Sequence, residues 1–201
     1  MLTLKDGKVM ATLDYYNKNA KVFVAGTISA NMEVHYSCFT KYLKSGSKIL
    51  DLGCGSGRDS LAFQKMGYKV TAIDGSEEVC KEATAQTGID VKCMTFEELP
   101  YQNEFDGVWA CASLLHVKKS EMKEILKKVT RALKHSGVLY CSYKYGNQER
   151  IFDGRFFSDY TEKDILDLLA DTGLKCEKYW ISSDVRADRE DEKWLNIIAV
   201  K

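Results

Sequence analysis

One short stretch constrains the fold of this chain more than any other. The apolar run 48–52 leads into three glycines at every second position, Gly53, Gly55 and Gly57. The run predicts a buried parallel strand, and residues 56–66 predict the helix that follows it. Because glycine has no Cβ, the turn between them permits positive φ and lets a ligand lie against the main chain. The unpaired N–H groups and partial positive charge at the helix N-terminus favour an anionic ligand group.

A second predicted strand, residues 68–74, ends in an acidic residue, Asp74. Asp74 follows the glycine loop by about 20 residues, the offset at which a carboxylate binds the ribose hydroxyls of a nucleotide. The carboxyl ends of parallel strands share one edge of a sheet. The two features together therefore predict a nucleoside-type cofactor at that edge.

The spacing of the glycines distinguishes between cofactors. A dinucleotide-binding fold uses G-x-G-x-x-G, but here the third glycine is Gly57 and Arg58 occupies the dinucleotide position. Asp51 precedes the loop, and its carboxylate repels a pyrophosphate but can accept a hydrogen bond from an ammonium group. A ligand with an amino-acid end and a nucleoside end fits both features, and S-adenosylmethionine (SAM) has both ends.

Four segments, in order, resemble the motifs of class I SAM-dependent methyltransferases. Residues 51–57 resemble the first motif, residues 70–76 the second, residues 105–116 the fourth-strand motif, and residues 133–139 the turn into the fifth strand. The Gly-Arg-Asp-Ser run at 57–60 and the short chain are similar to small bacterial methyltransferases of the tellurite-resistance type.

The resemblance implies an α/β, Rossmann-like fold. We expect a mostly parallel sheet of seven strands in the order 3-2-1-4-5-7-6, with the last strand antiparallel and helices on both faces. We expect a single methyltransferase domain over residues 1–201, with an N-terminal helical cap (1–45) and a SAM-binding core (46–201). Residues 146–160, which are rich in aromatic residues and arginines, are interpreted as a long loop that covers the substrate.

Composition narrows the class of function. The 201 residues carry 29 basic and 29 acidic side chains, so no strong positive field draws the chain to nucleic acid or to an anionic membrane. The chain has neither an apolar run of membrane-spanning length nor an apolar signal segment, which predicts a cytoplasmic enzyme. The seven cysteines form no C-x-x-C pair and are interpreted as reduced thiols. Cys54, Cys111 and His116 match no metal-ligand spacing, so no metal is expected.

The resemblance also assigns cofactor-binding residues. Asp51 and the glycine loop are expected to hold the methionine end, Asp74 to bind both ribose hydroxyls, and Ala110 to offer its carbonyl to the ammonium group. The expected cofactor-binding residues are Tyr16, Asp51, Gly53, Cys54, Gly55, Gly57, Arg58, Asp74, Gly75, Ser76, Thr95, Phe96, Ala110 and Cys111.

Some of these residues have an alternative interpretation. Tyr16 is expected to place its hydroxyl near the methionine carboxylate, but packing on the sheet alone also explains it. Arg58 either binds the cofactor carboxylate or forms a surface ion pair. Thr95 stands where the family pattern has an aspartate that contacts adenine. His116 is the candidate general base, and the alternative is a helix-capping or core histidine.

The expected reaction moves the methyl group of SAM to an O, N or S atom of a small molecule, with S-adenosylhomocysteine as product. The candidate substrate contacts are Tyr143, Tyr145, Arg155, Phe157 and Arg186. The sequence lacks the Asn/Asp-Pro-Pro-Tyr-type motif of amino-directed nucleic-acid methyltransferases. Three alternatives stay open. They are an RNA- or protein-modifying methyltransferase, a non-catalytic SAM-binding module, and a nicotinamide oxidoreductase, which Arg58 disfavours.

Overall fold

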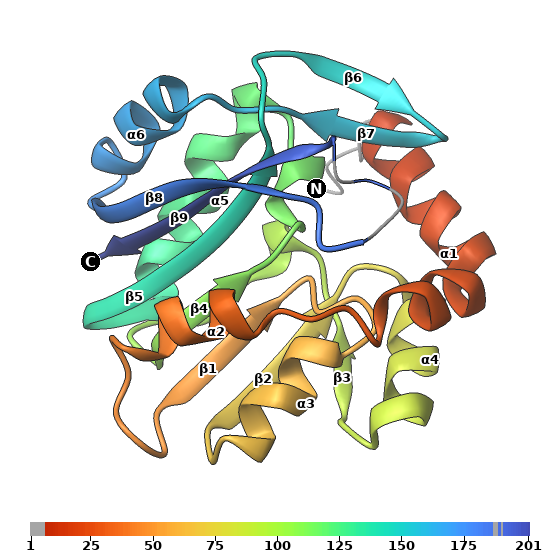
Figure 1. The fold of residues 1–201 in the computed structure, drawn as a ribbon, viewed down its shortest axis with the longest axis horizontal. Coiled ribbons are helices and arrows are strands. Elements are labelled where there is room, and N and C mark those ends of the chain that lie inside the picture. The colour runs from red at the N-terminus through yellow and green to blue at the C-terminus, as the bar shows by residue number, and fades with distance from the viewer. Residues whose placement is uncertain (1–6, 187–188, 190) are drawn as a thin grey trace.

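A seven-stranded sheet forms the centre of the molecule in the computed structural model, which describes residues 7–186, 189 and 191–201 (Figure 1). Its strands lie in the order β3-β2-β1-β4-β5-β9-β8. β1 pairs in parallel with β2 and β4, whereas β9 is antiparallel to both of its neighbours, β5 and β8. Numbered within this sheet alone, the order is 3-2-1-4-5-7-6, so the predicted fold class is confirmed.

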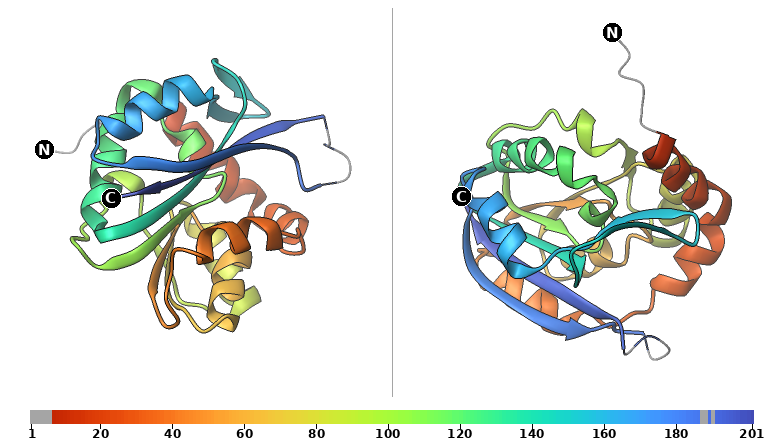
Figure 2. Two further views of the ribbon diagram at one scale, coloured as in Figure 1. Left: turned by 60° about the vertical axis from the view of Figure 1, so that its left-hand side comes forward. Right: turned by 90° about the horizontal axis from the view of Figure 1, so that it is seen from above.

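Helices cover both faces of this sheet (Figure 2). The strands of the sheet are β1 (Lys48–Leu52), β2 (Lys69–Asp74), β3 (Val91–Cys93), β4 (Phe105–Ala110), β5 (Leu133–Lys144), β8 (Lys175–Ser183) and β9 (Lys193–Val200). The helices are α1 (Gly7–Thr27), α2 (Glu33–Thr40), α3 (Arg58–Lys65), α4 (Glu77–Thr87), α5 (Lys119–Ala132) and α6 (Glu162–Ala170), with short 3₁₀ turns η1 (Phe96–Glu98) and η2 (Leu114–His116). None of these helices combines the length and the apolar character that a membrane-crossing segment needs.

Each face of the sheet has its own apolar core. On one face, Ile125 of α5 and Ile165 of α6 belong to a buried cluster that includes Leu50 of β1. On the other, Phe39 of α2 and Phe63 of α3 pack with residues of β4 and β5 in a second cluster. Burial on both faces explains why the central strands are continuous apolar runs in the sequence.

Residues 146–160 differ from the predicted loop. They contain an antiparallel hairpin, β6 (Glu149–Phe152) and β7 (Arg155–Ser158). Asp153 and Gly154 form its two-residue turn, with φ of 50° and 72°. Positive φ at both central residues is what a type I′ turn requires, and Asp-Gly is a preferred sequence for it. This dipeptide between two runs of strand-forming residues was a sufficient signal for the hairpin.

The hairpin and α1 lie against each other on the same side of the molecule (Figure 1). The N–H of Phe156 donates to Oγ1 of Thr12 (3.0 Å), and the hydroxyl of Tyr15 donates to Asp153 (3.0 Å). A Cβ at Gly154 would lie 3.2 Å from the Tyr15 ring, so the turn and the helix approach closely. α1 and the hairpin therefore form one wall built from two distant parts of the chain.

Candidate active site

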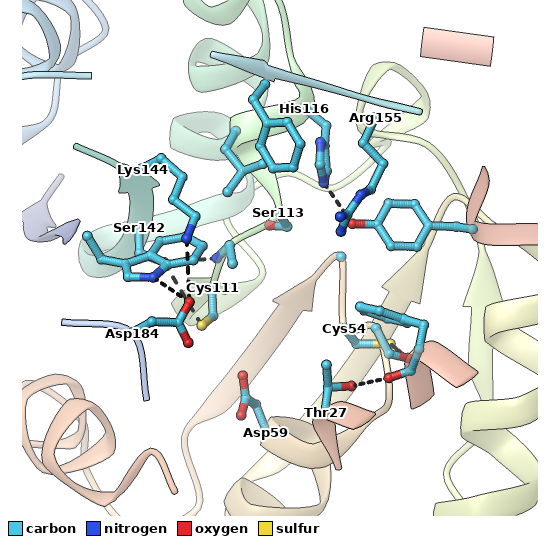
Figure 3. A pocket seen from close by; sticks show the side chains of 18 of the residues that line it. Thr27, Cys54, Asp59, Cys111, Ser113, His116, Ser142, Lys144, Arg155 and Asp184 are labelled. Carbon is cyan, nitrogen blue, oxygen red and sulfur yellow. Dashed lines mark hydrogen bonds and ion pairs between the residues drawn. The ribbon is translucent and has the colours of Figure 1, made fainter. Parts of the chain in front are cut away.

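A cavity of about 540 Å³ lies at the carboxyl ends of β1, β2 and β4. The glycine loop, Asp74 and residues 111–113 line it from the sheet, while α1 and the hairpin contribute side chains from outside. In Figure 3, His116 and Arg155 lie on the side opposite Cys54 and Thr27. The volume is typical of small-molecule sites, and this edge is where open α/β sheets bind ligands.

The glycine loop is held by hydrogen bonds to the end of β2. The N–H groups of Gly53 and Cys54 both donate to the carbonyl of Ile73, at 3.0 and 2.9 Å. The N–H of Gly55 donates to Oδ2 of Asp74 (3.0 Å). The loop and the acidic strand end are thus in direct contact at one sheet edge, as their spacing in the sequence predicted.

The glycines of the loop have different surroundings. All three have positive φ, between 55° and 76°. A Cβ at Gly53 would lie 2.5 Å from Cβ of Ser113, so the loop after β4 fits against it only if residue 53 has no side chain. Gly53 and Gly55 line the cavity. Gly57 does not: it precedes α3, and a Cβ there would lie 3.1 Å from Thr87 of α4.

Asp74 faces the cavity with both carboxylate oxygens oriented by the main chain. Oδ1 accepts from the N–H of Ser76 (3.0 Å), and Oδ2 accepts from Gly55. Burial raises the pKa of Asp74, and these backbone hydrogen bonds act against that shift. Each carboxylate oxygen keeps a lone pair for a ligand. The arrangement suits a diol, the chemistry that the sequence assigned to Asp74.

Asp51 lies outside the cavity lining, and its expected contact with an ammonium group stays a prediction. The side chain is 1% exposed, and its carboxylate accepts a hydrogen bond from the hydroxyl of Ser60 (2.6 Å). Burial, together with the nearby Asp59, raises the pKa of Asp51 to about 8. The side chain of Asp51 thus connects the end of β1 to α3.

Ser76 and Ala110 also lie outside the cavity lining. Ser76 is fully buried and caps α4, where its hydroxyl accepts from the N–H of Val79 (3.2 Å) and donates to Asn17 (2.7 Å). The hydroxyl of Ser76 thus acts as a helix cap, and its expected contact with adenine stays a prediction. Ala110 is fully buried at the end of β4, and the next residue, Cys111, lines the cavity instead.

The alternative interpretation of Arg58 as an ion pair holds, although the pair is buried and not at the surface. Nε and Nη2 of Arg58 donate to the two carboxylate oxygens of Asp59, at 2.6 and 2.9 Å. Asp59 also accepts from the hydroxyl of Tyr36 (2.5 Å) and from Nε1 of Trp109 (2.8 Å). Burial acts to raise the pKa of Asp59, but Arg58 and these donors hold it below its usual range. Arg58 lines the cavity with its fork already occupied.

Tyr16 and His116 contact each other within the cavity lining. Nδ1 of His116 lies 2.6 Å from the carbonyl oxygen of Phe156, which can only accept, so Nδ1 carries the proton. Nε2 is then the acceptor for the Tyr16 hydroxyl at 2.9 Å. Burial lowers the pKa of His116 to about 4 and raises the pKa of Tyr16 to about 12. Both side chains are therefore uncharged at neutral pH, and the lone pair of the predicted base is occupied by a tyrosine hydroxyl.

The lowered pKa of His116 makes a prediction about stability. The unfolded chain protonates this residue near 6.5 and the folded chain near 4. His116 therefore contributes stability fully above pH 6.5, and this contribution is lost as the pH falls towards 4. The loss amounts to about 3 kcal/mol by pH 4, since one pKa unit corresponds to about 1.4 kcal/mol. We expect urea unfolding of His116→Gln to show a weaker decrease of stability over this pH range than the parent chain.

His135 offers the matched control, because it is exposed. His135→Gln should keep the parent's pH dependence. His35 is buried and its pKa is also lowered, chiefly by burial, so it contributes to the pH dependence of every variant. The quantity to compare is therefore the difference in pH dependence between His116→Gln and His135→Gln. Equal pH dependence in His116→Gln and the parent chain would contradict the assigned protonation state.

The adenine-side residues Gly75, Thr95 and Phe96 all line the cavity. The hydroxyl of Thr95 donates to the carboxylate of Glu98 (2.9 Å), and the same carboxylate accepts from the Thr95 N–H (2.9 Å), forming a capping box at η1. The Phe96 ring lies beside Gly53, where an added Cβ would be 3.4 Å from the ring. Phe96 thus offers an aromatic surface to the cavity.

Four of the five candidate substrate-contact residues line the cavity. Tyr145, Arg155, Phe157 and Arg186 line the cavity. Tyr143 does not: it is fully buried on the opposite face of β5, where its hydroxyl donates to Sδ of Met122 (3.8 Å).

Asp184 is a cavity residue that sequence reasoning missed. It accepts from both ends of the Arg186 fork (2.9 and 2.7 Å), from Nε1 of Trp194 (3.0 Å) and from Lys144 (3.4 Å). Lys144 also forms an ion pair with Glu192. Asp184 directly follows β8, whose carboxyl end lies at the same edge as that of β5 because both strands are antiparallel to β9. This strand-end position was the available signal.

Comparison with known proteins agrees with this geometry. Residues 49–137 match the family described as "Methyltransferase domain". The chain is 31% identical to YqeM of Bacillus subtilis (strain 168) over 142 residues, which cover 63% of this chain and 56% of that protein. It is 36% identical over 104 residues to a ubiquinone biosynthesis O-methyltransferase of Idiomarina loihiensis, covering 48% of this chain and 42% of the relative. The chain thus spans about half the length of these curated relatives.

Solved structures share the fold over the whole chain. The Burkholderia thailandensis 1,6-didemethyltoxoflavin-N1-methyltransferase, solved with 1,6-didemethyltoxoflavin and S-adenosylhomocysteine, superposes with a TM-score of 0.80 at 20% identity. That match covers 100% of this chain and 92% of the other. The magnesium protoporphyrin IX methyltransferase of Synechocystis PCC 6803, solved with SAM, gives 0.73 at 17% identity, covering 100% and 99%. At these identities the likeness concerns the fold.

Proposed function

We propose that the chain is a class I SAM-dependent methyltransferase that transfers the methyl group of SAM to a small-molecule acceptor, and its fold and its match to a methyltransferase domain support this. One observation carries this proposal: the Asp74 carboxylate and the glycine loop are joined by a hydrogen bond at the mouth of one cavity. The structural neighbours solved with a small molecule or with SAM support the same class of reaction. The closer likeness to tellurite-resistance-type enzymes stays a prediction from the sequence.

The residues that line the cavity fit SAM. Asp74 provides acceptors for the ribose hydroxyls, and Gly53 and Gly55 let the ligand lie on the main chain. Thr95 and Phe96 lie where adenine is expected, with the Phe96 ring as a stacking surface. We propose one methyltransferase domain in which residues 1–45 act as the cap of the core formed by residues 46–201.

SAM brings its own activated methyl group, so the protein has to position the acceptor and exclude water. We propose that Tyr16 and His116 act together at this position. The Phe156 carbonyl fixes the tautomer of His116, and His116 in turn orients the Tyr16 hydroxyl. A proton released by the acceptor would reach His116 through that hydroxyl. An acceptor that is already deprotonated, or that has a free lone pair, needs no such transfer.

We expect His116→Ala to reduce kcat by about 10²-fold or more, the usual contribution of a positioned base, with little change in SAM affinity. Tyr16→Phe removes only the hydroxyl and should give a similar decrease if the two residues act together. The double variant should then be no slower than the slower single variant. Initial rates and isothermal titration with SAM provide the two measurements. Unchanged turnover in His116→Ala would remove the residue from the mechanism.

The experiment that tests the proposed function is a methylation screen of a metabolite extract with methyl-labelled SAM. Label in a small molecule supports the proposal, whereas label only in RNA or protein would support the macromolecular alternative. SAM binding without release of S-adenosylhomocysteine would support a non-catalytic module. Titration with NAD, for which no binding is expected, tests the oxidoreductase alternative.

A further inference from the structure

Arg155 differs from three of the other arginines that line the cavity. Arg58, Arg150 and Arg186 each form a two-point ion pair, with Asp59, Asp159 and Asp184. Each pair joins Nε and one terminal nitrogen to the two oxygens of a single carboxylate. This fork is the geometry in which a guanidinium binds a carboxylate or a phosphoryl group most strongly.

The fork of Arg155 has no such partner among the described residues. Its side chain is only 15% exposed, and its buried Nε makes no hydrogen bond there. One terminal nitrogen donates to Asp153 at 3.1 Å, but Asp153 is 58% exposed and also accepts from Tyr15. Because Asp153 is largely exposed to water, this one-point contact is weaker than a buried two-point pair. The guanidinium is therefore largely removed from water while its strongest binding geometry is unused.

The guanidinium of Arg155 is also held in a defined position. It lies over the ring of Tyr15 (4.6 Å) and near the ring of Phe157 (5.4 Å). Contacts of this kind fix the charge with little loss of its hydrogen-bonding capacity. Figure 3 shows the side chain pointing into the cavity beside His116, whose Nε2 is bonded to Tyr16. Arg155 is thus beside the pair that we assign to the methyl acceptor and across the cavity from Cys54 of the glycine loop.

From this contrast we propose that Arg155 recognises an anionic group of the methyl acceptor, a carboxylate or a phosphoryl group, through Nε and a terminal nitrogen. The inference rests on the proposed function. It narrows the substrate class to acidic small molecules. The ligand has two possible sources, because SAM also has a carboxylate, and the experiment has to separate them.

The test uses the protein saturated with S-adenosylhomocysteine and three probes of one shape: benzoate, phenylphosphonate and neutral benzamide. We expect benzoate or phenylphosphonate to shift the NMR signal of the Arg155 Nε–H and to bind at least about tenfold more tightly than benzamide. Arg155→Gln should weaken binding of the anion by about tenfold or more. Arg155→Lys keeps the charge without the fork and should weaken it by a smaller factor.

The controls separate this inference from the proposed function. Arg150→Gln combined with Asp159→Asn removes an already paired arginine from the same hairpin, and anion binding should stay within about twofold. Affinity for S-adenosylhomocysteine should be unchanged in Arg155→Gln. If that affinity falls instead, Arg155 binds the cofactor carboxylate and the inference is wrong, although the proposed function stands. Equal binding of benzoate, phenylphosphonate and benzamide would also overturn it. If the parent chain binds no S-adenosylhomocysteine at all, the proposed function itself fails.

Discussion

Asp74→Ala should weaken the binding of SAM by about a hundredfold or more. Two hydrogen bonds from ribose hydroxyls to a carboxylate contribute about 3 kcal/mol together, and each 1.4 kcal/mol is a factor of ten. The structure supports this value because backbone N–H groups already orient both oxygens of Asp74 towards the cavity. The carboxylate has no rotational freedom to lose when the ligand binds, so little of the gain is offset. Isothermal titration with SAM and with S-adenosylhomocysteine measures the effect.

Two further variants serve as controls for the predicted effect of Asp74→Ala on SAM affinity. Asp74→Asn retains the shape of the side chain and one acceptor oxygen, so its affinity should lie between those of the parent and Asp74→Ala. Asp90→Ala removes an exposed aspartate just before β3, at the opposite edge of the same sheet, and should bind SAM like the parent. If folded Asp74→Ala bound SAM with unchanged affinity, the ribose assignment would be rejected.

The sequence predicted those parts of the site that are encoded locally. The glycine loop follows β1, and Asp74 is the last residue of β2. The parallel pairing of β1 with β2 places the carboxyl ends of these two strands side by side. The hydrogen bond between Gly55 and Asp74 is the result. The strand order followed from the resemblance of four motifs and is confirmed by the pairing of β9 between β5 and β8.

The sequence did not determine the directions of individual side chains. Tyr143 and Lys144 are neighbours in β5, and alternation puts one in the core and the other in the cavity. Alternation alone does not say which residue faces which side, since tyrosine and lysine can both line a cleft. Ser76 has two compatible roles, ligand contact and helix cap, and only the position of Asn17 in α1 shows that the hydroxyl is already paired.

The contact between Tyr16 and His116 could not be predicted from local sequence, because the two residues are 100 positions apart. It depends on α1 lying against the hairpin, whose backbone supplies the carbonyl of Phe156 to the histidine. The unpaired fork of Arg155 is also a tertiary property. The sequence contains several arginines near aspartates, and only the structure shows which of them are already neutralised.

The largest effect on stability is expected for Asp59→Ala. The carboxylate of Asp59 joins α2, α3 and β4, since it accepts from Tyr36, Arg58 and Trp109. Its removal leaves the guanidinium of Arg58, 18% exposed, without its carboxylate, and leaves two buried donors unsatisfied. Breaking a buried pair from one side costs about 3–5 kcal/mol, a large share of the 5–15 kcal/mol that stabilises a typical domain. Urea or thermal unfolding should therefore show a strongly destabilised or unfolded chain.

Two further variants test whether the loss of stability in Asp59→Ala comes from the unpaired charge of Arg58. Arg58→Gln combined with Asp59→Asn removes both charges and should be less destabilised than Asp59→Ala, because no unpaired charge is left in the interior. Asp106→Ala breaks a pair with Lys134 whose partners are 32% and 42% exposed, and it should lose no more than about 1 kcal/mol. The folded-state pKa of Asp59 is lowered, so its contribution is present above its ordinary value of 3.8 and is lost as the pH falls below it. If Asp59→Ala unfolded like Asp106→Ala, the network around Asp59 would not hold these three elements together.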